Sequence, residues 1–134
     1  MIAGIVAAQS AIPATPPPLV TRMLLANQSS TNFYSYKNPL TTADFIENID
    51  EPGVGRCAVW SPNGVYAAFG SDTGPYLVFA KRSGDTLTTI APTGTLPAGA
   101  VMSAAWSSDS STVYIASTGG NKIYRYTRSG DVFT

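Results

Sequence analysis

The residues that could carry chemistry in this 134-residue chain are few, and the most versatile type is missing. Histidine is absent, which removes the usual general base, the Ser-His and Cys-His nucleophile pairs, and nearly every ordinary zinc or iron site. Cys57 is the only cysteine. With no histidine to activate it, we expect a buried, unreactive thiol. The sequence therefore predicts no catalytic residue, no cofactor and no metal, in a protein that is not an enzyme.

Carboxylates are the remaining candidates for a reactive or metal-binding site. One acidic group consists of Asp44, Glu47, Asp50 and Glu51. These residues lack the regular spacing of an oxygen-ligand metal loop, and we interpret them as a solvated connector. Asp85 and Asp131 each follow a Ser-Gly pair, where a carboxylate caps the backbone amides of a turn. We therefore expect them to serve folding rather than paired-carboxylate catalysis.

Charge and composition exclude two classes of partner. The eight basic and eight acidic residues cancel, and charged residues make up only 12% of the chain. Such a chain creates no field that would gather a phosphate backbone or anionic lipid, so we expect no nucleic-acid partner. No apolar run reaches the length of a membrane span, so we expect no membrane partner. Twelve glycines and ten prolines interrupt the chain too often for long helices, which favours an all-β fold.

An internal repeat of 46 residues indicates the elements that position these residues. The shift places Trp60-Ser61 on Trp106-Ser107, and Arg82-Ser-Gly-Asp85 on Arg128-Ser-Gly-Asp131, without a gap. Within the first copy, four short segments rich in β-branched or aromatic residues are separated by turn formers: 56–60, 65–70, 76–81 and 86–90. A four-stranded antiparallel meander of this length is the blade of a β-propeller.

A third, degenerate copy lies upstream. Residues 24–36 overlay 114–126 without a gap, and Pro16 stands where the other copies have tryptophan. The predicted fold is an incomplete β-propeller of two clear blades and one degenerate N-terminal repeat. Its predicted parts are an apolar N-terminal strap at 1–18, a degenerate blade at 19–51, a blade at 52–97, and a blade at 98–134 that stops after its third strand.

Two sequence patterns resemble known propeller families. Val59-Trp-Ser-Pro-Asn-Gly64, followed by a strand of small residues, resembles the blade signature of WD40-like propellers. The segments 75–88 and 123–134 are similar to tandem repeats in tailed-bacteriophage virion proteins. This resemblance implies a structural protein of a virion, a tail, fibre or head-associated component bound to other virion proteins through its N-terminal part. The alternative is a propeller-type adhesin or scaffold that binds glycan or protein. An enzyme is a third possibility, because propellers also host hydrolases.

Two sets of residues are candidates for partner binding. In the uncharged strap, Ile2, Ile5 and Val6 would dock into a groove or add a strand to a larger assembly. The alternative, to which we give equal weight, is that the strap forms the first strand of the degenerate repeat. The second set consists of Tyr34, Tyr36, Tyr76, Tyr124 and Tyr126. These tyrosines would form an aromatic contact surface or, in the interpretation we favour, alternate rungs of half-buried strands.

The number of blades makes the chain a component of something larger. A propeller ring contains four to eight blades, and this chain supplies fewer. Three arrangements remain open: a longer polypeptide in which Thr134 is not the terminus, a homo-oligomer, or an N-terminal segment clamped by other proteins. Each follows from the apolar faces of a blade, which only a neighbour can bury. We expect Trp60 and Trp106, which recur at one blade position, to serve that packing.

Overall fold

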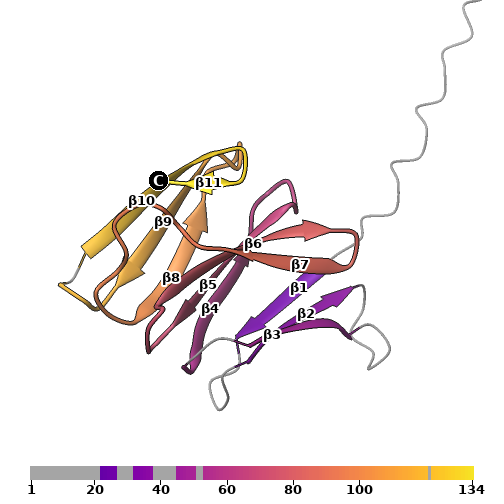
Figure 1. Ribbon diagram of the computed structural model, residues 1–134, viewed down its shortest axis with the longest axis horizontal. Coiled ribbons are helices and arrows are strands. Elements are labelled where there is room, and N and C mark those ends of the chain that lie inside the picture. The colour runs from indigo at the N-terminus through magenta and orange to yellow at the C-terminus, as the bar shows by residue number, and fades with distance from the viewer. Residues whose placement is uncertain (1–21, 27–31, 38–44, 51–52, 121) are drawn as a thin grey trace, which may run out of the picture.

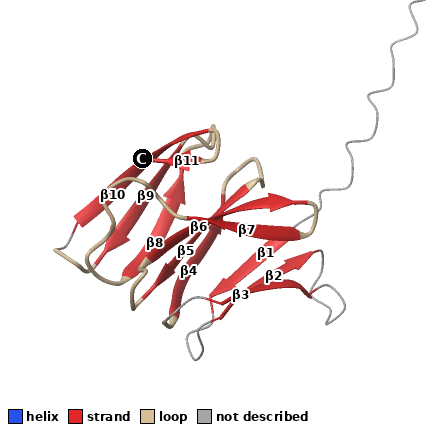
Figure 2. Ribbon diagram, viewed as in Figure 1, coloured by secondary structure: helices blue, strands red, loops and turns tan. Residues whose placement is uncertain are grey.

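The computed structural model describes residues 22–26, 32–37, 45–50, 53–120 and 122–134, with side chains described from residue 53 onward. The predicted strap with Ile2, Ile5 and Val6 lies outside the described residues. The described part is built from strands and loops, without a helix (Figure 2). The all-β class predicted from the glycine and proline content is confirmed.

The strands form three antiparallel sheets, each a meander in chain order. The first contains β1 (Arg22–Ala26), β2 (Asn32–Lys37) and β3 (Phe45–Asp50). The second contains β4 (Gly55–Trp60), β5 (Tyr66–Ser71), β6 (Leu77–Ser83) and β7 (Thr86–Ile90). The third contains β8 (Val101–Trp106), β9 (Thr112–Ser117), β10 (Lys122–Ser129) and β11 (Val132–Phe133). The sheets fan out side by side in chain order (Figure 1), as successive blades of an incomplete propeller.

One prediction about the last blade was wrong. The chain was expected to stop after the third strand, but β11 pairs with β10 and gives the sheet a fourth. The turn at Gly130 has a φ of 59°, which lets the chain reverse within two residues. Thr127 and Thr134 then exchange backbone hydrogen bonds of 2.8 and 3.0 Å. The third sheet therefore has four strands, like the second.

The repeated Trp-Ser pair forms the same hairpin in both four-stranded sheets. The Ser61 hydroxyl donates to the carbonyl of Tyr66 and accepts its N–H, both at 2.9 Å. Ser107 makes the same two bonds with Thr112, at 3.1 and 2.9 Å. The serine thus fixes the separation of the first two strands, which explains its constant position after the tryptophan.

The arginine of the repeated tetrapeptide joins two turns within its own sheet. Arg82 donates from Nε to the Gly64 carbonyl at 2.7 Å and from Nη1 to the glycine of its own tetrapeptide at 3.0 Å. Arg128 makes the equivalent bonds to Ser110, at 3.0 Å, and to its own glycine, at 2.9 Å. The rigid fork of a guanidinium suits this double contact. The tetrapeptide is therefore a folding element of the blade.

An aromatic core fills the joint between the second and third sheets. Phe79 stacks on Phe133 with ring centroids 3.9 Å apart. Tyr126 and Trp106 approach Phe79 edge to face, at 5.5 and 6.3 Å, an arrangement that aromatic rings prefer. The opposite face of the second sheet carries a second core, with Trp60 packed against it. The prediction that both tryptophans serve packing is confirmed.

Candidate functional site: the joint between blades

The two cores of the second sheet use corresponding positions of successive blades. The third sheet contributes eight residues to the core that it shares with the second, and six of them occupy recurring positions: Ala104, Trp106, Val113, Ile115, Tyr126 and Phe133. A shift of 46 residues converts them into the six residues of the core on the other face of the second sheet: Ala58, Trp60, Ala67, Phe69, Ala80 and Leu87. That face lies toward the first sheet, because β1 and β2 contact β4, and β3 contacts β7. The joint between blades is therefore itself the repeating unit.

A polar cluster closes the same joint at its edge. The Tyr66 hydroxyl donates to Asp131 at 2.6 Å, and Lys81 forms an ion pair with the other carboxylate oxygen at 2.8 Å. The Arg128 guanidinium lies over the Tyr66 ring, 4.4 Å from its centroid, a cation–π geometry. Hydrogen bonds from Lys81 and then Tyr66 lower the pKa of Asp131. Asp131 therefore bridges two blades, whereas the sequence suggested that it caps its own turn.

The second strand of one blade, β5, approaches the first strand of the next, β8, closely at Gly70. A Cβ added there would lie 2.8 Å from the Val101 carbonyl oxygen and 2.7 Å from the Cys57 sulfur, so nothing larger than glycine fits. Burial raises the pKa of Cys57 to about 11, although a hydrogen bond with the Gly70 backbone opposes the shift. The thiol is thus protonated at neutral pH, in agreement with the predicted unreactive cysteine.

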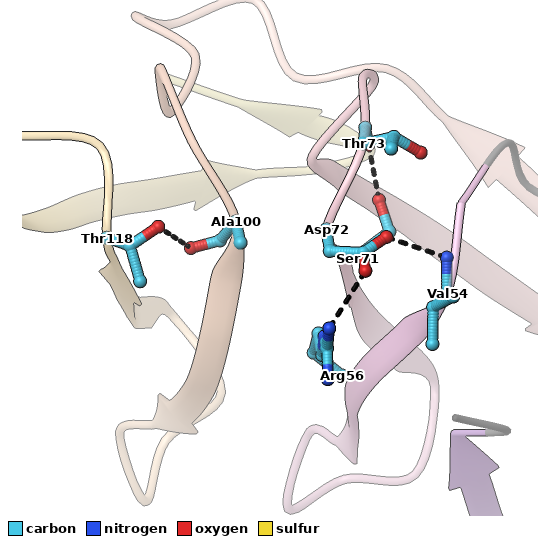
Figure 3. A network of polar contacts seen from close by, with 7 residues as sticks. All are labelled: Val54, Arg56, Ser71, Asp72, Thr73, Ala100 and Thr118. Carbon is cyan, nitrogen blue, oxygen red and sulfur yellow. Dashed lines mark hydrogen bonds and ion pairs between the residues drawn. The ribbon is translucent and has the colours of Figure 1, made fainter. Parts of the chain in front are cut away.

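An ion pair spans the first two strands of the second sheet (Figure 3). Asp72 accepts a hydrogen bond from the Val54 N–H at 2.8 Å and pairs with Arg56 at 2.9 Å. The third sheet has Thr118 at the position of Asp72, and its N–H donates to the Ala100 carbonyl at 2.9 Å. The ion pair therefore belongs to one blade and is not part of the repeat.

Arg56 occupies a β-bulge, as does its counterpart Met102. Bulges redirect a side chain and are frequent beside functional sites. The Arg56 side chain keeps 34% of its surface exposed and that of Asp72 keeps 23%. A guanidinium in this setting has donors to offer an anion, whereas the carboxylate is already occupied by two donors. Arg56 is the candidate ligand-binding residue that this geometry provides.

The described tyrosines do not form a shared exposed surface. Tyr126 is only 2% exposed and donates from its hydroxyl to the Thr95 carbonyl at 2.5 Å. Burial, and then the nearby Tyr124, raise the pKa of Tyr126 to about 12. Tyr76 and Tyr124 are half-buried and pack against the core that contains Tyr126. Tyr126 as a partner-binding residue is therefore corrected to a core residue, because its ring fills the joint.

The other predicted residues fall partly outside the described side chains. Tyr34 and Tyr36 lie on β2, paired with Leu25 and Met23 of β1. The acidic segment contributes Glu47 and Asp50 to β3, while its other two members lie outside the described residues. Where side chains are described, no group of three or more histidine, cysteine or acidic residues could hold a metal ion. No helix in the described part is long and apolar enough to cross a membrane.

Sequence reasoning missed the Arg56–Asp72 pair. The signal that would have found it is a difference between aligned copies, because Met102 and Thr118 occupy the corresponding positions. Identities between the two copies indicate residues that serve folding. The departures from identity are where one blade acquires a property of its own.

Comparison with known proteins identifies the fold alone. No protein-family model and no curated protein matches the sequence. Among solved structures, the chain is similar to a "putative 6-phosphogluconolactonase" from Bacteroides fragilis, with a TM-score of 0.70 and 15% identity over 84% of this chain. It is also similar to a protein from Lactobacillus plantarum, with a TM-score of 0.65 and 17% identity over 84% of this chain. The chain spans about a third of the length of these neighbours, 34% and 36% respectively.

These neighbours correct the predicted function. They are propeller proteins, so the coarser half of the resemblance, tandem propeller blades, is confirmed. Nothing in them indicates a WD40 protein or a bacteriophage virion, and the predicted structural role in a virion is wrong. The physical reason is that the motif behind the phage resemblance, Arg-Ser-Gly-Asp, serves turn and joint formation. Such a motif carries information about the fold and none about where the protein acts. The predicted alternative, an adhesin or scaffold, gains no support from these neighbours.

Proposed function

We propose that this chain supplies successive blades to a β-propeller ring, completes that ring only with further blades, and contributes no catalytic residue to it. The observation that carries the proposal is the repetition of the joint. The second sheet packs residues of both faces into cores, and the residues that the second and third sheets each direct toward the preceding sheet lie 46 positions apart. In such an array, stability comes largely from contacts between neighbours, so a blade without a neighbour is incomplete.

The neighbours' size supports the same interpretation. This chain covers 34% and 36% of two propeller proteins while aligning over most of its own length. Our proposal assigns further blades to the ring in which this chain works.

A tandem protein tests the proposal. Two full-length copies joined head to tail should unfold at a higher temperature and with a steeper denaturant dependence than the single chain, because the junction creates one more joint. The single chain at twice the molar concentration is the control for concentration alone. If the tandem melts at the temperature of the single chain, no joint forms and the proposal fails.

A second candidate function is enzymatic. We infer it from two observations: the likeness to a protein named for 6-phosphogluconolactonase activity, and the half-buried guanidinium of Arg56 at a bulge. Guanidinium groups bind phosphate through paired hydrogen bonds. Arg56 would hold the phosphate of a sugar lactone, and the general base would come from another part of the ring, because Asp72 is occupied by Arg56 and Val54.

Lactone hydrolysis by the assembled ring tests this candidate. Hydrolysis that falls with Arg56→Met, mainly through a higher KM, would favour the enzyme. The methionine is the residue at the corresponding position of the next blade, so the substitution should not disturb the strand. An assembled ring that hydrolyses no lactone would contradict the enzymatic candidate and leave the supply of blades as the function.

A further inference from the structure

The outer face of the third sheet corresponds to the face of the second sheet that the third sheet covers. Large residues of the outer face are exposed. Ile123 is 75% exposed, whereas its counterpart in the second sheet, Leu77, is 1% exposed. Tyr114 is 47% exposed, whereas its counterpart Ala68 is fully buried. Both residues lie on one face, because Ile123 is paired with Ala116 and Tyr114 with Arg125 across β9 and β10. This outer face therefore continues an established interface.

The chemistry of the outer face differs from that of the covered one. Arg125 stands where the second sheet has Phe79, and Ala116 stands where it has Gly70. Tyrosine, arginine and large apolar residues together are typical of interfaces between separate chains, whereas a closely packed aromatic core is typical of a joint within one chain. The face is suited to a partner that approaches less closely than the third sheet approaches the second.

The first blade, at the other end of the chain, has residues that correspond to those with which the third sheet covers the second. The overlay of residues 24–36 on 114–126 extends one residue upstream, and it places Met23, Leu25 and Tyr36 at the positions of Val113, Ile115 and Tyr126. Those three residues of the third sheet cover the second sheet. The first blade thus has the residue types that a blade uses to cover the one before it.

The charges of the first blade and of the outer face of the third sheet are opposite in sign. Half of the eight acidic residues lie between positions 44 and 51, in and around β3 of the first blade. The outer face of the third sheet contains exposed Arg125, and exposed Lys122 begins the same strand. Complementary charge steers association and fixes orientation between partners.

We propose that a second copy of this chain docks its first blade on the outer face of β8–β11, so that copies associate head to tail. The inference rests on the proposed function, since it names the partner that supplies the next blade. Such an interface joins two different surfaces of the same protein, and it forms a closed ring when the rotation per copy closes, or an open filament when it does not.

Sedimentation velocity over a hundredfold concentration range tests the association. The wild-type chain should form species larger than the monomer, and Ile123→Lys should weaken the association about tenfold or more, because a charge enters the apolar centre of the contact. Leu96→Lys is the matched control. Leu96 is 50% exposed in the loop between β7 and β8, so its substitution should leave association unchanged. Circular dichroism confirms that both variants are folded.

A mixing experiment separates this arrangement from nonspecific association. Ile123→Lys disables one surface and keeps the first blade intact, so substoichiometric amounts should bind at one end and shorten wild-type assemblies. Association that the variant does not shorten, or that Leu96→Lys weakens equally, would overturn the proposal.

The result also distinguishes this inference from the proposed function. A chain that stays monomeric, while the covalent tandem gains stability, would overturn the second copy as partner and leave the blade-supplying function standing. A monomeric chain together with a tandem that gains nothing would overturn both.

Discussion

The hydroxyl of Tyr66 lies 2.6 Å from a carboxylate oxygen of Asp131, a residue 65 positions away in the sequence. This hydrogen bond joins the second strand of one blade to the last turn of the next. The joint therefore combines a nonpolar centre with a directional polar contact at its edge. The polar contact specifies how far one blade can rotate against the other, which apolar packing alone defines poorly.

Acid should weaken this joint through Asp131. Lys81 and Tyr66 lower the pKa of the folded carboxyl below the unfolded value of about 3.9. The stability that Asp131 adds is therefore present above that value and lost as the pH falls through the folded pKa. Asp131→Asn should be less stable than wild type at pH 7, and the difference should shrink on acidification. Urea unfolding at several pH values between 7 and 3 measures it.

The double-mutant cycle of Tyr66→Phe with Asp131→Asn is the control for this prediction. The phenylalanine keeps the ring and removes the hydroxyl, so the cycle isolates the hydrogen bond. A coupling energy of zero, or a wild type and Asp131→Asn that lose stability in parallel with pH, would contradict the role assigned to Asp131.

Arg128→Ala should cost more stability than Arg82→Ala. Both arginines join two turns of their own blade, but Arg128 also lies 4.4 Å from the centroid of Tyr66 in the neighbouring blade. The excess should be about 0.5–2 kcal/mol, the range of a cation–π contact. Urea unfolding of the two variants measures the difference, and equal losses would show that the contact contributes nothing across the joint.

Gly70→Ala should destabilise the protein. In an ordinary strand position, alanine is more stable than glycine by roughly 0.5–1 kcal/mol. The added methyl meets the Val101 backbone and the Cys57 sulfur, and overpacking of this kind costs about 1–3 kcal/mol. Ala116→Gly, at the corresponding position of the outer face, is the matched control and should lose only the strand preference. Thermal and urea unfolding compare them; a neutral Gly70→Ala would mean that the blades can separate there at little cost.

Ser110 combines a cost and a benefit that two substitutions separate. Its φ is 61°, a left-handed conformation that costs a non-glycine residue about 1–2 kcal/mol. Its hydroxyl accepts a hydrogen bond from the Asn63 N–H of the preceding blade at 3.1 Å. Ser110→Ala loses the bond and keeps the strain, whereas Ser110→Gly loses both. Unfolding experiments should therefore find Ser110→Gly more stable than Ser110→Ala by about 1–2 kcal/mol; the reverse order would contradict the strain.

The sequence predicted the strands well because the signals are local. The four predicted strands of the second sheet, from residue 56 to residue 90, each lie within two residues of those observed. β-Branched and aromatic residues between glycine, proline and asparagine turns determine such boundaries. The 46-residue repeat then indicated that the two clear blades share one architecture, and Trp60 and Trp106 lie in the cores as expected.

The partners of those strands could not be predicted, because they depend on contacts between blades. Asp131 was interpreted within its own turn, and its role became visible only when Tyr66 and Lys81 were placed beside it. Tyr126 was a candidate for partner binding because an alternating strand pattern does not say which face is covered. The Arg56–Asp72 pair could not be predicted from the repeat, because Met102 and Thr118 stand at the corresponding positions of the next copy.

The splitting of each joint between two successive 46-residue units has a consequence for how such proteins change over generations. One unit contributes one face to the contact with the preceding unit and its other face to the contact with the following unit. Duplication or loss of a whole unit in the gene therefore leaves every surviving contact with both of its halves. Chains built this way can gain or lose whole units without redesign of any interface. Arg125, which stands where the preceding unit has Phe79, marks a face that is no longer interchangeable with the others.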